Sequence, residues 1–144
     1  MIKMVAVGTD GSETAQVAVD FAMDMAEKYG AKLLIASAYK PVSESKLRRE
    51  QTDAPADIQW SINPSEEVDA TLRKVEEAAG ERGLAYASEA RNGDPADVLC
   101  DIAGDHGADV IVVGNKGMQR RLLGSVPNTV AHNAPCSVYI VKTT

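Results

Sequence analysis

The chain has 144 residues, with ordinary hydrophobic and charged fractions of 44% and 25%, which suits one domain spanning residues 1–144. Its net charge of -6 argues against a nucleic-acid partner, because a phosphate backbone would be repelled overall. No apolar run approaches the roughly 20 residues that span a bilayer. The N-terminus also lacks a cleavage signature, so we expect a cytoplasmic protein without membrane contact.

The N-terminal third predicts a strand, a helix and a second strand. Residues 2–7 are short and apolar, as is typical of a parallel strand buried on both faces. Ser12 is a natural N-cap for a helix that ends at Gly30, and residues 31–39 form the second buried strand. Apolar residues recur every four positions along the helix, with alanines beside them that suggest close packing on a sheet: Val17, Phe21 and Met25, then Ala18, Ala22 and Ala26.

Residues 40–62 show no clear periodicity and include the only tryptophan, Trp60. A loop of this length in a compact domain indicates a lid, a flap or a short extra helix, and we expect a helical turn around residues 44–50. Trp60 either covers a ligand or anchors the loop to the core, and anchoring is the commoner role.

The middle of the chain predicts two more helices with a strand between them. The capping sequence Asn63-Pro64 begins a helix that ends at Gly80 or Gly83. Residues 84–90 alternate only weakly, which favours a less buried strand at an edge of the sheet. Asp94 caps the next helix. The inner faces are expected to be Val68, Leu72, Val75 and Ala79 in the first helix and Val98, Leu99, Ile102 and Ala103 in the second.

The C-terminal third predicts a strand over residues 108–113, a short helix over 125–133 and a last strand over 136–142. The short helix is expected to turn Val126, Val130 and Ala131 inward. Five strands thus alternate with four helices, which predicts an α/β fold with a parallel sheet, helices on both faces and right-handed crossovers. With the strand order 3-2-1-4-5, the loop after the first strand lies beside the loop after the fourth, where such sheets bind ligands.

The cysteines and histidines give no sign of a metal site. Cys100 and Cys136 fall in a predicted helix and a predicted strand, without metal-ligand spacing. His106 and His132 are far apart in sequence. We therefore expect core thiols in a reducing compartment and no metal site built from His or Cys.

The functional signal lies in residues 110–130, which read as strand, glycine-rich loop and helix. An apolar run stops at Gly114, and a helical pattern resumes at Ser125. Backbone N–H groups of such a loop, together with the N-terminus of the next helix, make an anion site suited to phosphate. The alternative is a glycine-rich turn with solvated arginines. Three nearby cations favour phosphate: Lys116, Arg120 and Arg121.

We assign roles around this site from chemistry and expected position. Asp10 either accepts hydrogen bonds from a ribose, holds a divalent ion such as Mg²⁺ against phosphates, or only caps the turn before the first helix. A backbone group near Ala38 can meet the edge of a base. The candidate nucleotide-binding set is Thr9, Asp10, Ala38, Val113, Gly114, Asn115, Lys116, Gly117, Arg120, Gly124, Ser125 and Val126, with phosphates held by loop N–H and hydroxyl groups.

On these residues the chain resembles the universal stress protein family. The resemblance runs through VAVGTDGS, ASAY, GDPADVL, ADVIVVGNKG, LLGSVPNTVAHNAPCSV and YIVK, and so covers nearly the whole chain. The glycine pattern of the ATP-binding members maps onto Gly114, Gly117, Gly124 and Ser125. The resemblance implies a Rossmann-like, adenine nucleotide alpha hydrolase-like three-layer fold. It also implies adenine-nucleotide binding, with ATP first, and a homodimer through the last strand, Cys136–Lys142.

One departure from the family pattern affects the ligand. Only six residues, MQRRLL, separate Gly117 from Gly124, fewer than the ATP-binding members usually have. Either the loop is tighter, with Arg120 supplying charge in place of backbone, or the ligand carries fewer phosphates, as AMP and cyclic AMP do.

No catalytic machinery is evident in the sequence, which lacks a P-loop and a positioned base for phosphoryl transfer. We therefore expect no enzyme, with at most slow, incidental ATP hydrolysis. The leading hypothesis is a nucleotide-binding stress-response module that presents a surface to an unknown regulatory protein. A weak ATPase and a dimeric interaction protein that no longer binds nucleotide remain as alternatives.

Overall fold

The computed structural model describes residues 1–39, 64–115 and 126–143. The predictions for residues 40–63, including the helical turn, Trp60 and the Asn63 cap, lie outside these ranges. The elements are, in chain order, β1 (Met4–Gly8), α1 (Glu13–Tyr29), β2 (Lys32–Tyr39), α4 (Pro64–Glu81), β3 (Tyr86–Asn92), α5 (Pro95–His106), β4 (Val110–Gly114), α6 (Val126–Asn133) and β5 (Ser137–Val141).

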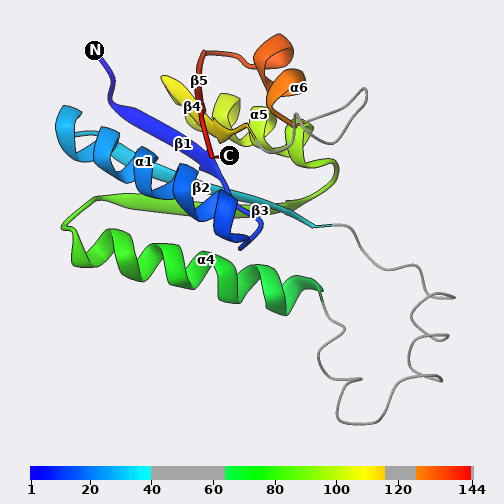
Figure 1. Cartoon of the computed structure of the whole chain (residues 1–144), viewed down its shortest axis with the longest axis horizontal. Helices are drawn as coiled ribbons and strands as arrows, with labels where there is room; N and C mark the ends of the chain where they lie inside the picture. The colour runs from blue at the N-terminus through cyan, green and yellow to red at the C-terminus, as the bar shows by residue number, and fades with distance from the viewer. Residues whose placement is uncertain (40–63, 116–125, 144) are drawn as a thin grey trace, which may run out of the picture.

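The strands form one parallel sheet in the order β3-β2-β1-β4-β5, which confirms the predicted topology. Helices α1 and α4 pack on one face of the sheet, and α5 and α6 pack on the other (Figure 1). Successive side chains of β1 alternate between the two cores, with Val5 and Val7 in the first and Ala6 in the second. All three are fully buried, as expected of a central strand covered on both sides.

Helix α1 begins and ends at the predicted residues. The Ser12 hydroxyl accepts a hydrogen bond from the Ala15 N–H at 3.2 Å, and Gly30 closes the helix in the left-handed conformation. The predicted alanine stripe packs on the sheet together with Val19 and Met23. The expectation for Val17 is wrong, because its side chain is 44% exposed: the contacting stripe is centred on the alanines, and Val17 lies off it.

The later elements follow the predictions with small corrections. The helix predicted from Pro64 is α4, and Gly83, not Gly80, lies beyond its end with a positive φ of 73°. Strand β3 is an edge strand, as expected. In α6, Val130 is fully buried, but Ala131 is exposed, since this short helix meets the sheet through a narrow face. Among the described helices, none is long and apolar enough to cross a membrane.

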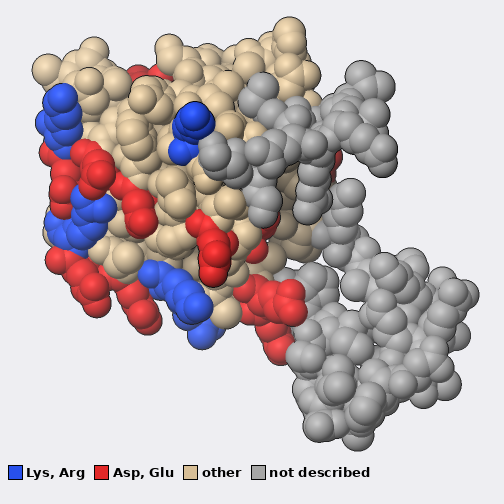
Figure 2. Space-filling model, in the orientation of Figure 1, with Lys and Arg blue, Asp and Glu red and all other residues tan. Residues whose placement is uncertain are grey.

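Charge is distributed unevenly over the surface. Figure 2 shows Lys, Arg, Asp and Glu side chains gathered over α1 and α4. At the end of α4, the Arg82 guanidinium donates to Glu27 at 3.0 and 2.9 Å and to Asp24 at 2.5 Å, both on α1. These exposed ion pairs link the C-terminal end of α4 to α1.

Candidate functional site

The turn after β1 is fixed to the end of β2 by hydrogen bonds. The Thr9 N–H donates to the Ala36 carbonyl at 3.0 Å, and the Ser37 hydroxyl donates to the Thr9 carbonyl at 2.8 Å. Thr9 is only 7% exposed, so the start of the turn is packed into the protein. These hydrogen bonds hold the turn that carries Asp10 at the carboxyl edge of the sheet.

Asp10 makes the local contact that its capping interpretation predicts. One carboxylate oxygen accepts from the Ser12 N–H at 2.9 Å, while the Gly11 N–H donates to the Thr9 hydroxyl at 3.1 Å. Gly11 has a φ of +82°, which glycine adopts readily and other residues rarely do. The side chain of Asp10 is exposed and also lines a pocket, so the turn contact and a ligand contact are compatible.

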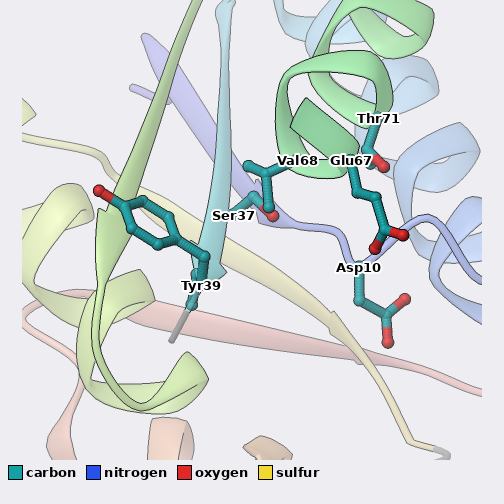
Figure 3. A pocket seen from close by; sticks show the side chains of 7 residues that line it. Asp10, Ser37, Tyr39, Glu67, Val68 and Thr71 are labelled. Carbon is teal, nitrogen blue, oxygen red and sulfur yellow. The ribbon is translucent and has the colours of Figure 1, made fainter. Parts of the chain in front are cut away.

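The pocket opens between the ends of β1 and β2 and the first turns of α4 (Figure 3). Its volume is about 260 Å³, and its lining residues are Asp10, Ser37, Ala38, Tyr39, Glu67, Val68 and Thr71. The fold thus brings together two of the predicted site residues, Asp10 and Ala38. Three further lining residues come from α4 and were not predicted as site residues: Glu67, Val68 and Thr71. Glu67 and Thr71 each precede a residue of the predicted buried stripe, which was the available signal that they border the core.

The end of β4 is closely packed. A Cβ atom on Gly114 would lie 3.0 Å from the Thr143 Cγ2 and 3.8 Å from the Thr14 carbonyl oxygen. A side chain at this position would therefore press on the Thr143 methyl group, which would have to shift. Because the carbonyl of Thr14 belongs to the first turn of α1, the start of the predicted phosphate loop lies beside the start of that helix.

Asn115 is occupied by the C-terminal strand rather than open to a ligand. Its N–H donates to the Val141 carbonyl at 2.9 Å, which extends the ladder between β4 and β5. Its side-chain oxygen accepts from the Thr143 N–H at 2.7 Å and from the Thr143 hydroxyl at 2.9 Å. In this structure the Asn115 N–H is therefore paired with β5, and its predicted contact with a nucleotide stays a prediction.

The remaining predicted residues divide into two groups. Val113 is 4% exposed and belongs to the core under α5 and α6, so only its backbone is near the site. Val126 is half-buried at the start of α6. The phosphate-loop residues Lys116, Gly117, Arg120, Gly124 and Ser125 lie outside the described residues, and the phosphate grip stays a prediction.

The sequence matches a known protein family along nearly its whole length. The model of the family described as "Universal stress protein family" matches residues 1–142. The chain belongs to the universal stress protein family. Universal stress protein Rv1636 of Mycobacterium tuberculosis is 38% identical over 146 residues, which cover 99% of this chain and 97% of that protein. The predicted family and its α/β fold are thereby confirmed.

Two solved structures with bound nucleotides are similar to this universal stress protein along nearly its whole length. A universal stress protein in complex with cAMP is 36% identical, with a TM-score of 0.77 and 99% of both chains covered. An Arabidopsis thaliana universal stress protein family protein with AMP bound is 17% identical, with a TM-score of 0.67 and 97% and 91% of the two chains covered. At that identity, the second resemblance establishes the shared fold alone.

Proposed function

We propose that this chain binds an adenine nucleotide at the carboxyl edge of β1, β2 and β4 and acts as a regulatory homodimer rather than as an enzyme. The observation that carries the proposal is the pocket shared by Asp10 and Ala38, next to the strand end at Gly114. Strand order reverses at β1, since its neighbours are β2 and β4. Open parallel sheets bind ligands at such a point.

The dimensions favour one orientation of the ligand. Neighbouring strands lie about 4.8 Å apart, so β2 and β4 are separated by roughly 10 Å. This is the scale of a nucleotide that spans from a base at Ala38 to a phosphate near Gly114. The described part of the pocket has a volume of about 260 Å³, which is enough to receive a purine base. Two carboxylates in its lining, Asp10 and Glu67, would repel phosphate and direct it toward β4.

Cyclic AMP is the first ligand to test, with AMP and ATP beside it. A relative that is 36% identical over its whole length is described in complex with cAMP. The short connection between Gly117 and Gly124 also favours fewer phosphates than ATP carries. Within the described residues, no group of three or more His, Cys, Asp and Glu side chains is placed to hold a metal ion. Mg²⁺ at Asp10 stays a prediction, with nucleotide oxygens as its other ligands.

The test is calorimetric titration and thermal unfolding with cAMP, AMP and ATP, the last with and without Mg²⁺. A ligand that binds only the folded state must raise the melting temperature. We expect Gly114→Val to weaken binding at least about a hundredfold, because its side chain would force apart Thr143 and the start of α1. Gly80→Val is the matched control, since a Cβ there has open space. Unchanged affinity in Gly114→Val would remove the site.

The same preparation tests the absence of catalysis. We expect little or no phosphate release from ATP over the time of a binding measurement, because no general base is proposed beside the phosphates. Sustained release that Asp10→Ala abolishes would favour the weak ATPase instead.

The proposed homodimer uses β5, an edge strand of the sheet. Tyr139 and Ile140 on this strand are 44% and 40% exposed, and residues 126–141 include no Asp, Glu, Lys or Arg. An apolar strand edge without charges invites pairing with another strand. A cytoplasmic location and an as yet unidentified regulatory protein partner belong to the same proposal. Sedimentation as a monomer at micromolar concentration would contradict the dimer.

A further inference from the structure

One wall of the pocket is contributed by α4 through Glu67, Val68 and Thr71. Figure 3 shows the Glu67 carboxylate projecting from the helix toward the side where Asp10 lies. Thr71 follows Glu67 by one helical turn, on the same side of α4. The Thr71 hydroxyl lies 2.9 Å from where a Cβ of Gly11 would stand, so α4 is seated directly against the turn after β1. Glu67 is thereby held over the pocket by a helix in close contact with its floor.

The ligand group nearest Glu67 follows from the strand order. Ala38 and Tyr39 end β2, which is two strands away from the end of β4. If phosphates lie at β4, the sugar lies near β1 and Asp10, and the base lies at β2 beside α4. Val68 and Ala38 offer the base an apolar surface, and Glu67 offers it a charged polar group.

We propose that Glu67 selects the base of the ligand by accepting a hydrogen bond from the exocyclic amino group of a 6-aminopurine. An ionised carboxylate accepts hydrogen bonds but donates none. An adenine amino group can satisfy it, whereas the oxo group of hypoxanthine places a second acceptor against it. The inference rests on the proposed function, because it requires a purine nucleotide in this pocket. It adds the residue that distinguishes the amino base from the oxo base.

The size of the discrimination can be bounded. Sites built to hydrogen-bond one ligand group reject an analogue without that group strongly, because the protein group is left unpaired. Glu67 is exposed to water, as is Glu66, and this reduces the penalty for leaving its carboxylate unpaired. We therefore expect the wild-type chain to prefer the amino base by about tenfold.

The experiment compares cyclic AMP with inosine 3′,5′-cyclic monophosphate by calorimetric titration. The two ligands share ribose and phosphate. In the purine, inosine has an oxo group in place of the amino group and a hydrogen on N1, so its nearest donor lies one ring position away. Glu67→Gln offers both a donor and an acceptor, so we expect the preference to fall to about threefold or less. The matched control is Glu66→Gln, an exposed residue of the same helix turn that does not line the pocket, and it should keep the wild-type preference.

The ratio of the two affinities isolates the base from other effects. Removing a negative charge favours any anionic ligand, but it does so equally for both cyclic nucleotides and cancels in the ratio. An unchanged ratio in Glu67→Gln, or an equal loss of both affinities, would overturn the assignment while leaving nucleotide binding intact. Failure of the wild-type chain to bind either ligand would instead overturn the proposed function.

Discussion

The two edge strands of the sheet carry different kinds of side chain, charged on β3 and apolar on β5. At β3, the Glu89 carboxylate pairs with the Arg91 guanidinium and lies 3.1 Å from the His106 ring on α5. Arg91 also reaches Asp105 at 2.7 Å. At β5, the corresponding surface is aromatic and aliphatic, with the ring of Tyr139 stacked on Phe21 at a centroid distance of 4.7 Å.

The difference supports the proposal that β5, rather than β3, pairs with a second copy of the chain. Charged side chains on an edge strand protect it from pairing with other chains, and β3 carries them. Strand β5 has instead two half-exposed apolar residues and no charged residue between its ends. The polar contacts on its side of the sheet are concentrated at its C-terminal end, where Asn115 holds Thr143.

The largest effect is expected from placing a charge on each edge in turn. Tyr139→Asp should weaken the proposed dimer at least about thirtyfold, or about 2 kcal/mol, as loss of a central aromatic contact does. Tyr86→Asp is a matched control, because Tyr86 lies on β3 and is 42% exposed, against 44% for Tyr139. Sedimentation equilibrium measures both, with circular dichroism to confirm folding. Equal effects of the two substitutions would end the distinction between the edges.

A smaller effect is expected at the C-terminal end of β5. Asn115→Ala removes the acceptor of two hydrogen bonds from Thr143 and should lower the free energy of unfolding by about 1–2 kcal/mol. Asn115→Asp keeps an acceptor oxygen and should lose less. Urea denaturation gives both values. If Ala and Asp are equally destabilising, the hydrogen bonds to Thr143 contribute nothing and this end of β5 is held by the strand ladder alone.

The smallest effect is expected at the charged edge and depends on pH. The Arg91 guanidinium, and then His106, lower the pKa of Glu89 below its ordinary value. The pair therefore stabilises the folded chain above the unfolded-state pKa, and this contribution is lost as pH falls through the lower folded-state pKa. Glu89→Gln should cost less than about 1 kcal/mol at neutral pH.

Urea denaturation at several pH values between about 7 and 3 checks this sign. The difference between Glu89→Gln and the wild-type chain should narrow toward the acid end. Glu77→Gln, at an exposed position of α4, is the control and should show no such trend. A difference that widens in acid would show that Glu89 is not stabilised in its ionised form.

Much of the fold could be predicted because its signals are local. Ser12, Gly30 and Asp94 mark helix ends through contacts within a few residues, and the apolar runs of the central strands need no knowledge of their neighbours. Alternation of these elements then restricts the topology to very few arrangements. The prediction that Asp10 lies at the same edge of the sheet as the end of β4 follows from that topology alone.

Which residues line the site could not be predicted from local signals in the same way. The periodicity of α4 identifies its buried stripe, but which strand ends it covers depends on how α4 packs across the sheet. The sequence therefore did not identify Glu67 as a residue that lines the pocket. The pairing of the Asn115 N–H with the Val141 carbonyl was not predicted for a similar reason, since Val141 lies far along the sequence.

The sequence by itself determined the order of elements, the family resemblance and the glycine-rich loop, because each depends on residues close together in the chain. Tertiary structure alone decided that α4 lends a carboxylate to the pocket, that Asn115 serves β5, and that one sheet edge is ionic and the other apolar. Those outcomes depend on which surfaces meet across the sheet. Short-range propensity cannot encode that choice, because it is made by the packing of the whole core.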